Sequence, residues 1–301
     1  MTDGNIRVPE ISTNHDGREV DCEVITRNGV NYYKQRTNAH GYHLDVLTGT
    51  YLPSIGESGV PIYMDYVDAC MRGFIAGASS FSSNGHSSYA LAVTGQPVHE
   101  AGAANISLTG VQLSFVSTSA QDSAAGTGVR TLIMSYIEHS TLAAKTEIIA
   151  MNGTTPVLTV AINIRFVNSL TMLTAGTGTA PAGTITATDG GITYGQIAVG
   201  HKVQASSYRM VPAGKVFVPH EIIASSNSGT AAAQAVFHIV NWSASLPYWI
   251  PSNAAGVQDG SIIISLKAGR AVPAGSIIGI EVTLNKGAEV TASIVGHLEN
   301  A

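Results

Sequence analysis

After residue 96, apolar and polar residues alternate in short runs that Gly, Asn, Asp or Pro separate. A period of two residues is typical of strands that bury one face, and the many β-branched residues favour strands over helices. The pattern predicts two series of strands: Val111–Thr118, Arg130–Ile137, Glu147–Ala150, Val157–Asn163, Thr184–Ala187 and Thr193–Val199, then Lys215–Val218, Ala233–Val240, Ser261–Leu266, Ser276–Leu284 and Glu289–Leu298.

Strands of this length and spacing indicate a sandwich or a barrel. We therefore predict a mainly β protein with an N-terminal β-hairpin region and one or two antiparallel β-sandwich domains. The expected divisions are residues 1–95 for the hairpin and linker, 96–205 for a β-sandwich, and 206–301 for a second sandwich or the second half of the first.

The N-terminal hairpin is the sharpest local prediction. Asn28-Gly29 lies between two alternating runs, and this dipeptide suits a type I′ turn, which needs positive φ at both central residues. A two-residue loop then places Arg27 opposite Val30, Ile25 opposite Tyr32, Glu23 opposite Lys34 and Asp21 opposite Arg36. The last two pairs join opposite charges, which supports this register independently of the turn.

Between residues 38 and 95, frequent Gly and Pro interrupt any long element. Within this region, Tyr63–Arg72 has apolar residues at helical spacing and predicts a short helix. The tract Gly77–Ser88 is almost entirely small and polar, so it predicts a flexible loop or linker. Val211-Pro-Ala-Gly and Val272-Pro-Ala-Gly each precede a predicted strand, and we interpret both as turns rather than as a gene duplication.

Residues 101–200 contain only seven charged side chains, whereas about a quarter of the residues in soluble domains are charged. Edge strands in water are normally protected by Lys, Glu or Pro. A region that mostly omits these residues predicts contact with other copies of the chain or with a large lattice. On this interpretation, a Lys at Val160 or Ile162 on a predicted strand should prevent assembly, whereas Glu10→Lys should not.

Charge and cysteine content exclude several classes of function. The net charge is −5 and no basic stripe is present, so we expect no binding to nucleic acid. The sequence has neither a secretory signal pattern nor an apolar run of about 20 residues, so we expect no signal peptide and no membrane helix. Cys22 and Cys70 lack zinc or redox spacing and are predicted to be buried, reduced thiols.

The chain contains no recognisable catalytic motif, and we predict that it is not an enzyme and has no cofactor. The strongest metal candidate is the group His40, His43 and Asp45, but ordinary polar surface is the favoured interpretation. The group His15, Asp16 and Glu19 is weaker. Asp189-Gly-Gly is interpreted as a turn before a calcium ligand, and Gly176-Thr-Gly178 as a loop, so we assign no metal site.

Three aromatic residues, Trp242, Tyr248 and Trp249, surround Pro247 and could stack on sugar rings. Packing between strands is the favoured alternative, because aromatic side chains bury large areas and no acidic pair is near them in sequence. These residues are nevertheless the candidate site for a glycan.

The stretches Ser117–Thr131 and Thr146–Val157 resemble sequences in virion structural proteins of tailed bacteriophages, and Tyr208–Lys215 and Ile222–Ser226 resemble the pattern that follows in the same family. The similarity covers roughly residues 100–298. It implies a β-sandwich or jelly-roll particle component made in the bacterial cytoplasm, and it implies no catalytic residues.

The leading hypothesis is therefore a non-enzymatic virion protein, most simply a capsid decoration or cement protein that stabilises the head. The alternative is a tail or baseplate protein that binds a glycan on the host surface, and a third is an enzyme acting on cell-wall polymer. The expected partners are copies of the chain itself, with a trimer favoured by the resemblance, and the major capsid or tail proteins of the phage.

Overall fold

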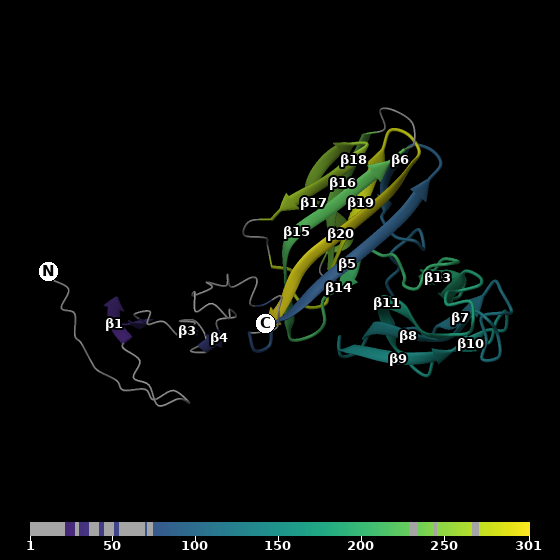
Figure 1. The fold of residues 1–301 in the computed structure, drawn as a ribbon, viewed down its shortest axis with the longest axis horizontal. Helices are drawn as coiled ribbons and strands as arrows, with labels where there is room; N and C mark the ends of the chain where they lie inside the picture. Colours follow the sequence, from purple (N-terminus) through teal and green to yellow (C-terminus); the bar gives the residue numbers. More distant parts are fainter. Residues whose placement is uncertain are drawn as a thin grey trace. The chain divides into compact units, whose positions relative to one another are not determined.

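The computed structural model describes the backbone of residues 22–27, 30–35, 42–44, 51–53, 70, 75–228, 234–243, 246–266 and 271–301. Side chains are described for residues 70, 75–228, 234–243, 255–266 and 271–301. Twenty β-strands lie among these residues, and every pairing between them is antiparallel (Figure 1). The prediction of a mainly β protein is confirmed. The chain divides into two compact units, residues 1–74 and 75–301.

The first unit contains the predicted hairpin. Strand β1 (Cys22–Arg27) pairs with β2 (Val30–Gln35), with Glu23 opposite Lys34 and Arg27 opposite Val30. This register is the predicted one; Asn28, Gly29 and the Asp21–Arg36 pair lie outside the described residues. Strand β3 (Tyr42–Leu44) pairs with β4 (Tyr51–Pro53). Cys70 has helical backbone and is buried, and the rest of the predicted helix Tyr63–Arg72 lies outside the described residues.

The second unit contains two bodies, each made of two sheets around one apolar core. The first body consists of the sheets β10-β7-β12-β13 and β11-β8-β9. Its strands are β7 (Ser114–Ser117), β8 (Val129–Glu138), β9 (Ala144–Ala150), β10 (Val157–Leu158), β11 (Ile164–Ala175), β12 (Ile185–Asp189) and β13 (Ile192–Ile197). Side chains from both sheets, such as Leu132 and Met134 of β8 and Ile185 of β12, pack in its core. The predicted alternation on β8 is what places those two side chains on the buried face.

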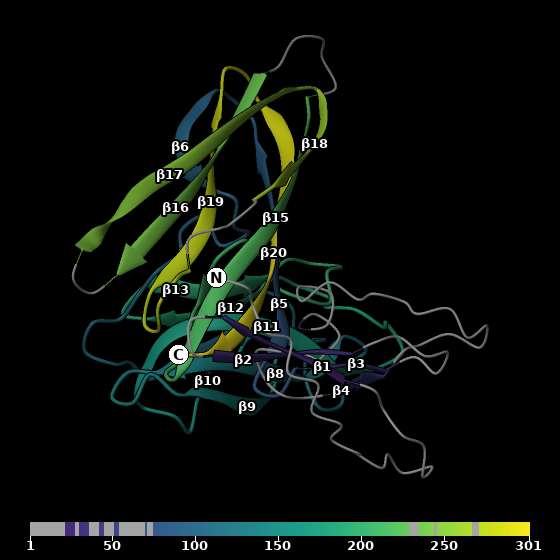
Figure 2. The same cartoon turned by 90° about the vertical axis from the view of Figure 1, so that its left-hand side faces the viewer.

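The second body consists of the sheets β14-β19-β16-β17, with β6 beside β19, and β18-β15-β20-β5 (Figure 2). Its strands are β5 (Ser79–Tyr89), β6 (Val93–Pro97), β14 (Arg209–Met210), β15 (Lys215–Asn227), β16 (Gln234–Ser243), β17 (Leu246–Gln258), β18 (Gly260–Ser265), β19 (Ile277–Leu284) and β20 (Ala288–Asn300). Phe237 of β16 and Ile294 of β20 belong to one core that both sheets share.

The prediction of a flexible linker at Gly77–Ser88 is wrong, because most of this tract forms strand β5. It pairs with β20 from Ser79 to Tyr89, and the backbone hydrogen bonds of this long pairing supply the ordering energy that small side chains lack (Figure 1). Gly85 has a specific role in this strand. A Cβ atom there would lie 2.2 Å from the carbonyl oxygen of Val98, so only glycine permits this approach.

A third apolar cluster joins the two bodies. Phe166 and Ile137 of the first body pack with Tyr208 and Val240 of the second, and the cluster also contains Trp242. The Val-Pro-Ala-Gly sequences are turns, as predicted. Gly214 and Gly275 have φ of +70° and +76°, and the amides that follow them, of Lys215 and Ser276, donate to the carbonyl oxygens of the two prolines.

Asp122 organises the loops at one end of the first body. Its carboxylate is fully buried and accepts hydrogen bonds from three backbone amides, those of Val129, Ala182 and Gly183, at 2.8–2.9 Å. The hydroxyl of Ser117 donates a fourth at 2.6 Å. These bonds connect the segments before β8 and β12 to the end of β7.

His99 lies at the junction of β5, β6 and the segment before β14, and it is buried. Its backbone N–H donates to the hydroxyl of Ser87 at 2.9 Å. Burial lowers the pKa of the imidazole to about 4, with a smaller contribution in the same direction from Arg209, against the effect of a hydrogen bond with the backbone of Ala205.

We predict that Asp122→Asn lowers the free energy of unfolding by about 2 kcal/mol or more, because an amide group replaces an acceptor that faces buried N–H donors. Asp189→Asn at an exposed turn is the matched control and should change stability by less than about 0.5 kcal/mol. Urea denaturation of both variants measures the difference. Equal midpoints for the two variants would show that the buried carboxylate is not required.

We also predict a stability loss in acid that depends on His99. Its folded-state pKa, about 4, is below the unfolded value of 6.5, so the unfolded chain binds this proton first as the pH falls. Stability should therefore decline between pH 6.5 and 4, by up to about 3 kcal/mol from this residue. Urea unfolding of His99→Gln over that range should show a shallower decline than the original chain. Parallel pH profiles would contradict the assignment.

Candidate assembly interface

The first body retains few charges on its surface, because most of its charged side chains are used internally. Asp122 and Arg165 are buried, and Glu138 forms an ion pair with Lys145. The carboxylate of Glu147 binds two backbone amides. Arg130 and Asp189, the other two of the seven charged residues between positions 101 and 200, are exposed.

A short extended segment on this body turns its apolar side chains outward. Leu158, Val160 and Ile162 are 61%, 88% and 70% exposed, whereas Thr159 between them is 2% exposed. This is the reverse of the usual arrangement, in which the apolar face of a strand is buried. We call these three side chains the apolar ridge.

Hydrogen bonds to Thr159 fix this orientation. Its backbone N–H donates to the carbonyl of Leu113 at 2.9 Å, and its hydroxyl oxygen accepts from the backbone N–H of Leu113 at 3.1 Å. The carbonyl oxygen of Thr159 accepts from the side-chain amide of Gln112 at 2.6 Å. A buried threonine with this many partners prevents the segment from rotating its apolar side chains inward.

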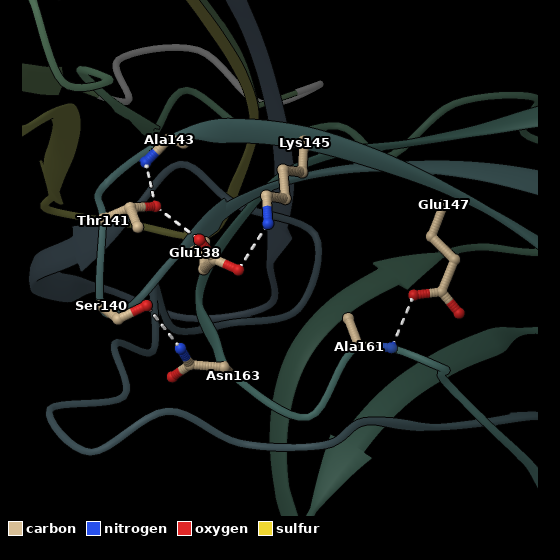
Figure 3. A network of polar contacts seen from close by, with 8 residues as sticks. All are labelled: Glu138, Ser140, Thr141, Ala143, Lys145, Glu147, Ala161 and Asn163. Carbon is tan, nitrogen blue, oxygen red and sulfur yellow. Dashed lines mark hydrogen bonds and ion pairs between the residues drawn. The ribbon is translucent and has the colours of Figure 1, made fainter.

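Glu147 of β9 holds the same segment from the other sheet. Its two carboxylate oxygens accept from the backbone N–H groups of Val160, at 2.6 Å, and Ala161, at 3.1 Å. Figure 3 shows the contact with Ala161 and, beyond it, the side-chain amide of Asn163 donating to the hydroxyl of Ser140 at 2.9 Å. The ridge is therefore anchored at its centre and at its end.

Glu138 and Lys145 form an ion pair, which Figure 3 shows together with Ala161 of the ridge segment. Their charged atoms are 2.6 Å apart, and the hydroxyl of Thr141 donates to the other oxygen of Glu138. The hydrogen bond from Lys145, with that from Thr141, lowers the pKa of Glu138, and the same bond raises the pKa of Lys145. The pair remains ionised, and each of its charges is compensated within the subunit.

The outer face of the β11-β8-β9 sheet is uncharged. Three cross-strand rows follow from the pairing register: Thr171–Ile133–Ile148, Ser169–Ser135–Thr146 and Thr174–Thr131–Ala150. Ile148 is exposed on this face, whereas Glu147, the residue before it, lies opposite the core residue Met134 on the other face of the sheet. We call these nine residues the neutral face.

The three aromatic candidates are only partly described. Trp242 is 5% exposed, packs in the cluster between the two bodies, and has the guanidinium of Arg165 5.8 Å from its ring centroid. This burial is what the packing alternative requires. Tyr248 and Trp249 lie on β17, but their side chains are outside the described residues. The arrangement of the three rings relative to one another therefore lies outside the described residues.

The histidine candidates also lie mostly outside the described residues. His43 lies on strand β3. His40, Asp45 and the group His15, Asp16 and Glu19 lie outside the described residues. Among the residues whose side chains are described, no three His, Cys, Asp or Glu residues are grouped to hold a metal. Asp189 begins a turn in which Gly190 and Gly191 have positive φ, and residues 176–178 form a loop, as predicted.

Sequence reasoning named Val160 and Ile162 as interface positions but missed Leu158 and the two residues that hold them, Thr159 and Glu147. The available signal was the alternation itself, Leu158-Thr-Val-Ala-Ile162. It indicates a strand with two unlike faces, although it does not indicate which face is buried.

No family model and no curated protein sequence matches this chain. Among solved structures, it has a weak similarity to a structure of infectious bursal disease virus Gx strain, with 11% identity over 73% of this chain and 70% of the other and a TM-score of 0.19. The VP2 subviral particle of the same virus gives 9% identity over 74% and 76% of the two chains and a TM-score of 0.17. A similarity at this level decides neither fold nor function. No helix within the described ranges is long and apolar enough to cross a membrane.

Proposed function

We propose that this chain is a non-enzymatic structural subunit of a tailed-phage virion, where it decorates or cements the head and assembles with copies of itself. Each body is proposed to act as an antiparallel sandwich of the jelly-roll type within the particle. The observation that carries the proposal is the apolar ridge, a set of exposed aliphatic side chains that the subunit holds rigidly outward.

Magnitudes support an interface that is larger than the ridge alone. Burying a Val, Leu or Ile side chain contributes about 1.5–3 kcal/mol, so three of them contribute roughly 5–9 kcal/mol. Association costs an estimated 4–15 kcal/mol in lost translational and rotational freedom. The ridge therefore needs additional buried area, and the neutral face of the same body is uncharged surface that carries no unpaired charge to desolvate.

The proposal assigns structural roles to the carboxylates of the first body. Asp122 and Glu147 bind backbone amides, and Glu138 binds Lys145. A general acid or base needs an oxygen directed at a substrate. These three side chains are instead directed at their own subunit, which supports a role in assembly over one in catalysis.

We predict that Val160→Lys converts the assembled protein into a monomer. The side chain is 88% exposed, so the change leaves the fold of the subunit intact but places a charge in the buried interface. Light scattering coupled to size exclusion should report 31.1 kDa for the variant and a multiple of this mass, three-fold for the favoured trimer, for the original chain.

Leu91→Lys is the matched control, because Leu91 is also an exposed aliphatic residue, 76% exposed, but lies on the second body. It should assemble like the original chain. A stable monomer of the original chain at micromolar concentration, together with its absence from particles purified from an infected culture, contradicts the proposal. Mass spectrometry of separated heads and tails distinguishes a head protein from a tail protein.

We further predict that Glu147→Ala weakens assembly without removing any ridge side chain. Loss of the carboxylate frees the amides of Val160 and Ala161, and the loosened segment must then be ordered again upon association. Hydrogen exchange should accelerate at these two amides, and the dissociation constant should rise roughly ten-fold or more. Lys145→Ala on the same strand is the control and should leave the exchange of both amides unchanged.

A further inference from the structure

An apolar pocket lies in the second body, between the two sheets. Its volume is about 290 Å³, and it is lined by buried residues such as Ile222 and Phe237 and by the partly exposed Ala255, Ile264 and Leu266. His238 is its only polar lining residue among those described. Strands β17 and β18, which carry Ala255 and Ile264, are the outermost strands of their sheets, so the pocket lies at an edge of the body.

The size and lining of this pocket suit aliphatic groups. A cavity of roughly 150 Å³ with aliphatic walls already admits benzene. Protein cores are normally packed without voids of this size, because atoms that line a void lose their contacts. A larger pocket that reaches core residues is therefore expected to receive an apolar group from outside the subunit.

The apolar ridge has the complementary properties. It presents three aliphatic side chains on an extended segment, carries no charge, and is held outward by hydrogen bonds. Two protruding ridges fit each other poorly, whereas a protruding ridge and a pocket can be packed closely. No charged side chain is among the three of the ridge or among the residues that line the pocket, so contact between these residues desolvates no charge.

We propose that the ridge of one subunit inserts into the pocket of the next copy of the same chain. The inference rests on the proposed self-assembly and defines its geometry as a contact between two different surfaces. Such a head-to-tail contact closes into a ring when the rotation permits and otherwise continues as a lattice. A three-membered ring is one of its closed forms.

The test uses two full-length variants that each damage one surface. Val160→Lys places a charge at the centre of the ridge and keeps the pocket, while Ala255→Trp fills the pocket and keeps the ridge. Each variant alone should be monomeric by light scattering. An equimolar mixture has one intact ridge and one intact pocket per pair, so it should form a species of twice 31.1 kDa and nothing larger.

The outcomes separate this inference from the proposed function. If Val160→Lys is monomeric and Ala255→Trp assembles like the original chain, or if the mixture stays monomeric, the ridge is an interface but the pocket does not receive it, and this inference is wrong. If Val160→Lys also assembles normally, the proposed use of the ridge is wrong.

A second measurement does not depend on the folding of Ala255→Trp. The chain with Val160→Cys and Ala255→Cys should form a ladder of disulfide-linked oligomers under mild oxidation, because the two positions face each other across the contact. The matched control carries Leu91→Cys with Ala255→Cys and the same native cysteines. Equal cross-linking of the two double variants would overturn the proposal.

Discussion

Hydrogen bonding of carboxylates to backbone amides is the interaction on which the first body depends. Asp122 uses it to join the segments that lead into two strands, and Glu147 uses it to hold the apolar ridge. A carboxylate satisfied in this way needs no cation, so the body can bury or cover its acidic groups without adding basic residues. The low number of charged side chains in residues 101–200 thus has a structural reason. Most of them bind groups of their own subunit, and the surface of the first body is left with few charges.

This use of charge determines what the surface can do. An exposed aliphatic side chain on a mobile loop would lose conformational freedom when it became buried at an interface, and this loss would offset part of the gain. The segment that carries Val160 is already fixed by Thr159 and Glu147, so most of its ordering takes place during folding. Preorganisation of this kind favours association for a given buried area. The same bonds that force apolar groups into water in the subunit therefore make those groups effective in an assembly.

Strands that bury one face were predictable from sequence, whereas strands with other environments were not. The prediction Arg130–Ile137 agrees closely with β8, Val129–Glu138. The local pattern does not predict strand β11, because its first residues, Ile164 to Asn168, are all buried. Register shifts also interrupt its pairing with β8, and together these features remove the alternation. The small side chains of strand β5 are typical of a linker, although the order of this strand comes from backbone pairing along its whole length. In each case a tertiary neighbour, absent from the local pattern, decided the outcome.

The apolar ridge shows the same limit at the functional level. The alternation from Leu158 to Ile162 predicts an extended segment with two unlike faces. Because side chains alternate with a period of two, either all of the aliphatic residues are buried or all of them are exposed. Local preference alone would bury the aliphatic face. The choice is reversed because Thr159 accepts hydrogen bonds inside the body from the backbone N–H of Leu113 and the side-chain amide of Gln112. In addition, the carboxylate of Glu147 on β9 accepts from the backbone N–H groups of Val160 and Ala161. Several hydrogen bonds hold the apolar side chain of Val160 in water, where its exposure is unfavourable. A partner that covers this side chain removes the unfavourable exposure. The orientation of this segment is therefore a stronger indication of assembly than the low charge that first suggested it.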